Sequence, residues 1–278
     1  MLMLIRTVSA ITPVLNGAPL IARTVDSIVN QSAIRSGRLN LTYIVCDGAS
    51  TDGTVEAARA ASDGAALDVI SEPDTGMYEA LAHGLRRATG DLVFYLNAGD
   101  MLFPNALDVV ADVMEAHDVR WVTGYDAYFN DAGAIVGARL PFRFRPALMQ
   151  VGIYGTMLPM VQQESTFWHR DMLDAVDLDQ LTAYRLAGDH YLWRRFSTLE
   201  ELTIAKVFLG GFGYHGNHLS ADIDEYRREL RRHCGTPRLR DRLRAQTDRI
   251  LWRAPDRLKK LANPRCMLVY EPDSGQWR

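Results

Sequence analysis

The sequence contains no run of about eighteen apolar residues, the length that a helix needs to cross a bilayer. Its first residues, "MLMLIRTVSAITPVLN", have no basic leader segment and no small-residue cleavage site, so they are expected to form a strand and not a signal peptide. These absences disfavour a membrane-spanning or exported protein, and a cytoplasmic location is expected.

Cysteine is scarce as well. The three cysteines, Cys46, Cys234 and Cys266, are an odd number, and no CxxC pair occurs. A disulfide framework and a structural zinc site are therefore disfavoured, and a reducing compartment is expected.

Two glycine-rich phosphate-binding motifs are missing. GxGxxG does not follow the first apolar segment, and GxxxxGK[ST] occurs nowhere, which disfavours a dinucleotide-dependent dehydrogenase and a P-loop enzyme. The stretch "TPVLNGAPL" also lacks the Arg or Lys that the glycine-rich loop of a sugar-nucleotide pyrophosphorylase carries. A nucleotidyltransferase is therefore disfavoured too.

What the first 125 residues do contain is a regular alternation. Short apolar segments such as "LTYIVCDG" and "DLVFYLNAGD" are each followed by a stretch with helical periodicity. This pattern predicts βαβ units around a mostly parallel sheet, with helices over 19–31, 52–62, 76–88 and 104–117. Pro104 is expected in the first turn of the last of these helices.

Polar residues stand where the predicted strands end. They are Asn16 after the first, Asp47 after the second, Glu72 and Asp74 after the third, and Asn97 and Asp100 after the fourth. Turns favour Asn and Asp, but ligands of parallel sheets bind at the carboxyl ends of the strands. Four polar ends in succession predict one shared pocket. Its carboxylates and amides suit a base, a ribose or a hard divalent cation.

The chain changes character twice after residue 125. From about 130 to 220 the alternation gives way to aromatic-rich segments, with "GAIVGARLP" as a possible edge strand. Residues 221–278 carry 15 Lys and Arg against 9 Asp and Glu, a net charge of +6, whereas the first 220 residues carry −9. We therefore predict a domain over 1–220 and a basic, helical C-terminal extension over 221–278.

Three motifs carry a family resemblance. "VCDGASTDGT", "SEPDTGMYEALAHG" and "TGDLVFYLNAGD", in this order and spacing, resemble the family 2 glycosyltransferases with the GT-A fold, over about residues 6–220. The resemblance implies an α/β fold with a mostly parallel central sheet flanked by helices. It also implies transfer of a sugar from a nucleotide-diphosphate sugar to a hydroxyl acceptor, in cell-surface polysaccharide or glycolipid assembly.

The resemblance assigns the strand ends to the donor. The residues that it implies for donor binding are Pro13, Asn16, Asp47, Asp74, Gly76 and Asn97. Gly76 would let the backbone approach the ligand. For Asp47 and Asp74 an ordinary turn role is the alternative.

A divalent cation is the cofactor that the resemblance implies. Many relatives end the fourth strand in D-x-D, but "NAGD" leaves Asp100 as the one strong ligand for Mg²⁺ or Mn²⁺. Diphosphate oxygens and water can complete the coordination, so binding without the donor should be weak.

The later motifs concern the acceptor. "QQESTFWHRDM" resembles the acceptor-side segment, which implies acceptor binding by Gln163, Glu164 and Trp168, although a core role for the tryptophan is an alternative. "LAGDHYLWRRF" resembles the segment that supplies the general base, which would be Asp189. Glu164 is the alternative base, and a helix cap is the alternative role of Asp189.

Three questions stay open at this level. His215 and His218 in "YHGNHLS" could face the diphosphate or the acceptor. The basic C-terminal segment could pack on the domain or lie on an anionic membrane surface, and nucleic-acid binding is not expected. A non-catalytic sugar-nucleotide or polysaccharide binding protein is the alternative function, because "NAGD" departs from D-x-D.

Overall fold

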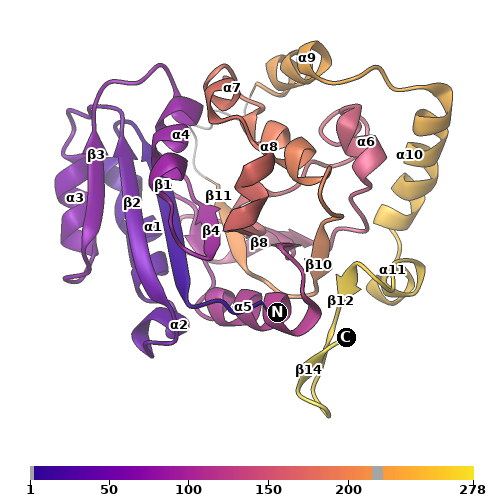
Figure 1. The fold of residues 1–278 in the computed structure, drawn as a ribbon, viewed down its shortest axis with the longest axis horizontal. Helices are drawn as coiled ribbons and strands as arrows, with labels where there is room; N and C mark the ends of the chain where they lie inside the picture. Colours follow the sequence, from indigo (N-terminus) through magenta and orange to yellow (C-terminus); the bar gives the residue numbers. More distant parts are fainter. Residues whose placement is uncertain (1–2, 215–221) are drawn as a thin grey trace.

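An eight-stranded sheet forms the centre of the protein, in the order β12-β10-β6-β9-β4-β1-β2-β3 (Figure 1). The computed structural model describes residues 3–214 and 222–278. β9 is antiparallel to β4 and β6, and the other neighbours are parallel, which confirms the predicted mostly parallel sheet. Its strands are β1 (Thr7–Val14), β2 (Asn40–Asp47), β3 (Leu67–Ser71), β4 (Leu92–Tyr95), β6 (Trp121–Thr123), β9 (Thr166–His169), β10 (Thr203–Ala205) and β12 (Met267–Leu268).

Helices cover both faces of this sheet because successive strand residues point to opposite sides. Val8 and Ala10 of β1 pack in one core with residues of α1, α3 and α5, while Ile11 packs in the other core with α4 and α8. The predicted helices are present, but Pro104 lies just before Asn105, the N-cap of α5. Their bounds are α1 (Ala18–Val29), α2 (Ser32–Arg35), α3 (Thr54–Ala61), α4 (Met77–Arg87), α5 (Ala106–His117) and α8 (Gly188–Phe196).

A second, four-stranded sheet has the order β5-β11-β7-β8 and includes the predicted edge strand. Its glycine-rich strand β11 lies unusually close to its neighbours. A Cβ atom on Gly210 would stand 1.8 Å from the carbonyl oxygen of Glu164, and one on Gly213 would stand 2.3 Å from that of Gly99. Only glycine allows this approach. The strands are β5 (Met101–Leu102), β7 (Asp126–Phe129), β8 (Ile135–Arg139) and β11 (Gly210–Gly213).

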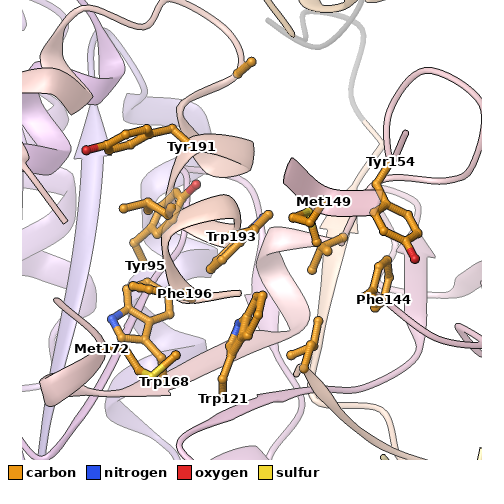
Figure 2. Packing of buried hydrophobic residues seen from close by; sticks show 14 of the residues in the cluster. Tyr95, Trp121, Phe144, Met149, Tyr154, Trp168, Met172, Tyr191, Trp193 and Phe196 are labelled. Carbon is orange, nitrogen blue, oxygen red and sulfur yellow. The ribbon is translucent and has the colours of Figure 1, made fainter. Parts of the chain in front are cut away.

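The aromatic residues after position 120 form much of the core beside α8 (Figure 2). Trp168 is fully buried, with its ring 5.7 Å from that of Trp193 and 5.4 Å from that of Phe196. The expectation that Trp168 binds the acceptor is therefore wrong in this structure, since its indole has no exposed surface. Short elements frame this core: α6 (Pro146–Gln150), η1 (Gln163–Ser165), η2 (Arg170–Ala175) and α7 (Leu178–Thr182).

The C-terminal segment is helical, as predicted, and it packs closely on the preceding residues. Tyr226, Leu230 and Trp252 belong to the same core as Trp168, and β12 pairs with β10. Asp248 is 1% exposed and accepts two hydrogen bonds from Arg145, at 2.7 and 2.9 Å. The elements are α9 (Ile223–His233), α10 (Leu239–Trp252), α11 (Asp256–Ala262), β13 (Tyr270–Glu271) and β14 (Gln276–Trp277).

Within residues 3–214 and 222–278, no helix combines the length and the apolar character that crossing a bilayer requires.

The approach of β11 to η1 gives a first prediction. Gly210→Ala should lower the free energy of unfolding by about 1–3 kcal/mol, because the added methyl group overlaps the Glu164 carbonyl. Gly137→Ala is the matched control in the same sheet, since its Cβ would lie 3.6 Å from the nearest atom. Urea denaturation of both variants measures the difference; equal stabilities would contradict the close packing of β11.

Candidate functional site

The carboxyl ends of β1 and β2 are joined by polar contacts. Asn16 has a positive φ of 50°, and its side-chain oxygen accepts a hydrogen bond from the backbone N–H of Thr51 at 3.0 Å. Asp47 is 2% exposed and accepts from the backbone N–H of Ser50 at 3.1 Å and from the hydroxyl of Ser71 at 2.6 Å. Asp47 therefore orders the loop after β2 and also ties β2 to β3.

Asp74 lies beside this loop. Its Oδ1 accepts from the backbone N–H of Gly76 at 2.9 Å, and its Oδ2 is so near Gly48 that a Cβ there would stand 2.7 Å away. Burial raises the pKa of Asp74, and the charges of Glu79 and Asp47 add to this effect. Gly76 has φ of 152°, and the space where its Cβ would point is open. The expected donor residues of β2 and β3 thus come together.

Pro13 is buried in the central strand β1. The Ile11 carbonyl accepts a hydrogen bond from the N–H of Leu96, so the backbone of Ile11 faces β4. Pro13 is two residues further along, so its backbone also faces the β4 side, beyond Ile11↔Tyr95, the last β1–β4 pair. Its missing N–H therefore leaves no strand hydrogen bond unmade.

The loop after β4 carries Asn97 and Asp100 beside the end of β1, where a Cβ on Gly17 would stand 3.2 Å from that of Ala98. Thr24 of α1 holds this loop, because its hydroxyl accepts from the N–H of Gly99 at 2.9 Å and donates to the Asp100 carbonyl at 2.7 Å. The Asp100 carboxylate is 3% exposed and accepts from the backbone N–H of Gly213 at 3.0 Å. The glycines of β11 are thus what allows the second sheet to reach Asp100.

The oxygen atoms of this loop fit a hard divalent cation. The side-chain oxygen of Asn97 is buried and has no hydrogen-bond partner in the described part of the chain, and Asp100 supplies a carboxylate nearby. Carboxylate and amide oxygens are the ligands that Mg²⁺ and Mn²⁺ prefer. Among the described residues, no group of three or more His, Cys, Asp or Glu could hold a metal ion.

The segment 162–165, which was expected to bind the acceptor, is largely occupied by structural contacts. The Gln163 side chain donates to the carbonyl of Tyr95 and accepts from the Asn97 amide at 3.5 Å. Gln162 makes two hydrogen bonds with the backbone of Ala127, at 2.7 and 2.8 Å. Gln163 thus links η1 to the end of β4, in addition to any contact with an acceptor.

Asp189 lies in the first turn of α8, whose N-cap is Ala187, so it is not the helix cap that was the alternative. Its Oδ1 accepts from the backbone N–H of His190 at 2.6 Å and from the hydroxyl of Tyr226 at 3.3 Å. Burial raises the pKa of this half-buried carboxyl to about 7, although both hydrogen bonds lower it.

Two further carboxyl groups belong to the same electrostatic cluster. Burial raises the pKa of Glu164 to about 7, and the charge of Asp189 contributes to the rise. Burial also raises the pKa of Asp100 well above its ordinary value, with a contribution from Glu164. The three acids therefore interact near the end of β4.

A cavity of about 630 Å³ lies between α2, α5 and the C-terminal hairpin and is lined by residues that include Asp108 and Trp277. It contains none of the three acids, Asp100, Glu164 and Asp189.

Sequence reasoning missed the contribution of α9 and of the β11 glycines. In "IDEYRRELRRH" the residues Tyr226, Glu229 and Leu230 share one helical face and are buried, a spacing that could have indicated packing against the domain. His215 and His218 lie outside the described residues.

The family follows from comparison with known proteins. Residues 9–158, more than half of the chain, match the family described as Glycosyl transferase family 2. The chain belongs to glycosyl transferase family 2. EpsE of Bacillus subtilis (strain 168) is 31% identical over 158 residues, 54% of this chain and 55% of that protein.

A second relative is named a PGL/p-HBAD biosynthesis glycosyltransferase, from Mycobacterium bovis (strain BCG / Pasteur 1173P2). It is 35% identical over 163 residues, which are 54% of this chain and 62% of that protein. The chain thus spans little more than half the length of these family 2 relatives.

Solved structures share the GT-A fold. TarS 1–349 of S. aureus, in complex with UDP-GlcNAc, superposes with a TM-score of 0.60 at 17% identity, covering 81% of this chain and 65% of TarS. Mannosyltransferase PcManGT from Pyrobaculum calidifontis, in complex with GDP-Man and Mn²⁺, gives a TM-score of 0.59 at 20% identity, covering 95% and 73%. At these identities the likeness establishes the fold.

Proposed function

We propose that this family 2 chain is an inverting glycosyltransferase, which moves a sugar from a nucleoside-diphosphate sugar to a hydroxyl of a glycan or lipid-linked acceptor. The observation that carries the proposal is the Asp189 carboxyl, whose pKa of about 7 suits a general base and which lies in a cluster with Glu164 and Asp100. Cell-surface polysaccharide or glycolipid assembly is the proposed setting, supported by the relative named for PGL/p-HBAD biosynthesis.

The reaction is a single displacement. Asp189 takes the proton of the acceptor hydroxyl while the acceptor oxygen bonds to the anomeric carbon. The bond from that carbon to the diphosphate breaks, and its electron pair leaves with the nucleoside diphosphate. Attack on the face opposite the leaving group inverts the anomeric configuration.

We propose that the nucleoside part of the donor is bound by Asn16, Asp47, Asp74 and the backbone at Gly76. They lie together at the ends of β1, β2 and β3, where parallel sheets bind ligands. Asp100 and Asn97 would hold Mg²⁺ or Mn²⁺, which supplies positive charge to offset that of the departing diphosphate. Glu164 and Gln163 would flank the acceptor.

Asp189→Asn tests the assignment of the base. Turnover should fall by about 10²–10⁴-fold, because Asn cannot take the proton, while donor affinity stays nearly unchanged. In the unmodified protein kcat/KM should fall as the pH drops below about 7, where Asp189 becomes protonated. Product analysis with UDP- and GDP-sugars gives the rates, and isothermal titration calorimetry gives the donor affinity.

Glu164→Gln is the matched control for this experiment, since the pKa of Glu164 is also about 7. Loss of turnover in Glu164→Gln alone would move the base to Glu164. Donor binding without any turnover in the unmodified protein would favour the non-catalytic alternative.

Asp100→Asn tests the cation site. Asn keeps an oxygen that can accept from the Gly213 N–H, so the melting temperature should not fall, but the charged ligand is lost. Donor affinity that Mn²⁺ increases in the unmodified protein should become independent of Mn²⁺ in the variant. Calorimetry of nucleoside diphosphate with and without Mn²⁺ measures this, with the exposed Asp112→Asn on α5 as control. Unchanged Mn²⁺ dependence would exclude Asp100 as a ligand.

A contact with the inner face of the membrane is part of the proposal. Leu239, Leu243 and Ile250 form one stripe on α10, where they are 73%, 60% and 73% exposed. The buried residues Ala245, Asp248 and Trp252 occupy the opposite side of the helix. Exposed arginines flank the stripe, at positions 242, 249 and 253, and this combination suits an anionic lipid surface.

The substitution of Leu239, Leu243 and Ile250 by Ser tests this contact without disturbing the core, whereas deletion of the segment would remove β12 from the sheet. Recovery with phosphatidylglycerol vesicles in flotation should fall several-fold, and added salt should weaken binding of the unmodified protein. Leu199→Ser, at a leucine that is 43% exposed elsewhere, is the control. Equal recovery with neutral and anionic vesicles would reject the proposed contact.

A further inference from the structure

Helix α9 is tied to the segment that leads into α8. The Glu229 carboxylate is 7% exposed and accepts three backbone hydrogen bonds, from Arg185 at 2.8 Å, Leu186 at 2.8 Å and Ala187 at 2.7 Å. Ala187 is the N-cap of α8, so these bonds fix the start of the helix two residues before Asp189. A carboxylate that satisfies three consecutive N–H groups is a strong constraint on the backbone.

One turn earlier on the same face of α9, Tyr226 reaches Asp189 itself. Its ring is 6% exposed, and its hydroxyl donates to Asp189 Oδ1 at 3.3 Å. Tyr226 also packs against Gly155, where a Cβ would stand 2.8 Å from the ring, so the tyrosine has little freedom to move. The carboxylate is thus held from two directions, by its own helix and by α9.

The titratable side chains that face Asp189 from the neighbouring elements are tyrosines and glutamates. They are Tyr78 of α4, Tyr95 of β4, Glu164 of η1, and Tyr226 and Glu229 of α9. None of these tyrosine and glutamate side chains can carry a positive charge. Tyr226 donates a hydrogen bond to the charged form of Asp189 and favours it, whereas the negative charge of Glu229 disfavours it.

We propose that α9 belongs to the acceptor side of the site, where Tyr226 and Glu229 are positioning residues that set the orientation and the protonation of Asp189. Tyr226 keeps Oδ1 occupied, which leaves the other carboxylate oxygen to take the acceptor proton. Glu229 fixes the start of α8, and its charge increases the basicity of Asp189. This inference rests on the proposed role of Asp189 as the base.

Two substitutions should shift the titration of Asp189 in opposite directions. Tyr226→Phe removes a hydrogen bond to the carboxylate, so the pKa of Asp189 should rise by about half to one pH unit. Glu229→Gln removes a negative charge, so the pKa should fall by a similar amount. Damage to the fold alone would not shift the pKa of Asp189 in opposite directions in the two variants. Tyr184→Phe, at a buried tyrosine that stacks on Tyr191 and contacts the His233 ring, is the matched control and should produce no shift.

The measurement is a carbon-13 carboxyl NMR titration of the full chain, with the Asp189 signal assigned from its loss in Asp189→Asn. The acid-side limb of the kcat/KM profile should move in parallel. Shifts of the same sign in both variants, or no shift in either, overturn the inference. If NMR shows opposite shifts while Asp189→Asn retains full turnover, α9 tunes Asp189 as inferred and the proposed function is what fails.

Discussion

Three carboxyl groups gather near the end of β4, where Asp100 and Glu164 are buried and Asp189 is half-buried, and much of the surrounding structure holds them there. Burial disfavours the charged form of each. The charge of Asp189 raises the pKa of Glu164, and the charge of Glu164 raises the pKa of Asp100. Burying carboxylates in this way raises the free energy of the folded state unless hydrogen bonds replace the lost contacts with water. The backbone N–H of Gly213 donates to Asp100, and the backbone N–H of His190 and the hydroxyl of Tyr226 donate to Asp189.

These partners come from parts of the chain that are distant in sequence. Gly213 belongs to the second sheet, and its approach to Asp100 requires that β11 carries no side chain at that position. Tyr226 belongs to a helix that composition alone describes as a charged tail. The same helix supplies Glu229 to the start of α8, so the C-terminal segment contributes to the geometry around Asp189 as well as to the core.

Much of the proposed donor side could be predicted from local sequence. Apolar segments that end on Asn16, Asp47 and Asp100 indicate strands with polar carboxyl ends, and parallel pairing brings such ends to one edge. The proposed acceptor side could not be predicted equally well. "QQESTFWHRDM" offers a glutamine and a tryptophan of suitable chemistry, yet packing buries Trp168 completely and uses the Gln163 amide to link η1 with β4. Burial depends on contacts with Trp193 and Phe196, which sequence spacing does not reveal.

The sequence by itself determined the alternation of strands and helices, the family and the polar strand ends, because periodicity and turn chemistry are local properties. It also indicated Asp189 as the candidate general base, through the resemblance of its segment to that of the family. Only the tertiary structure decided that Asp189 is not a helix cap, that its carboxyl has a pKa near neutrality, and that Tyr226 contacts it. The physical reason is that burial and long-range hydrogen bonds join residues far apart in the chain, such as Asp189 and Tyr226, which are 37 positions apart, and no local pattern encodes such pairs.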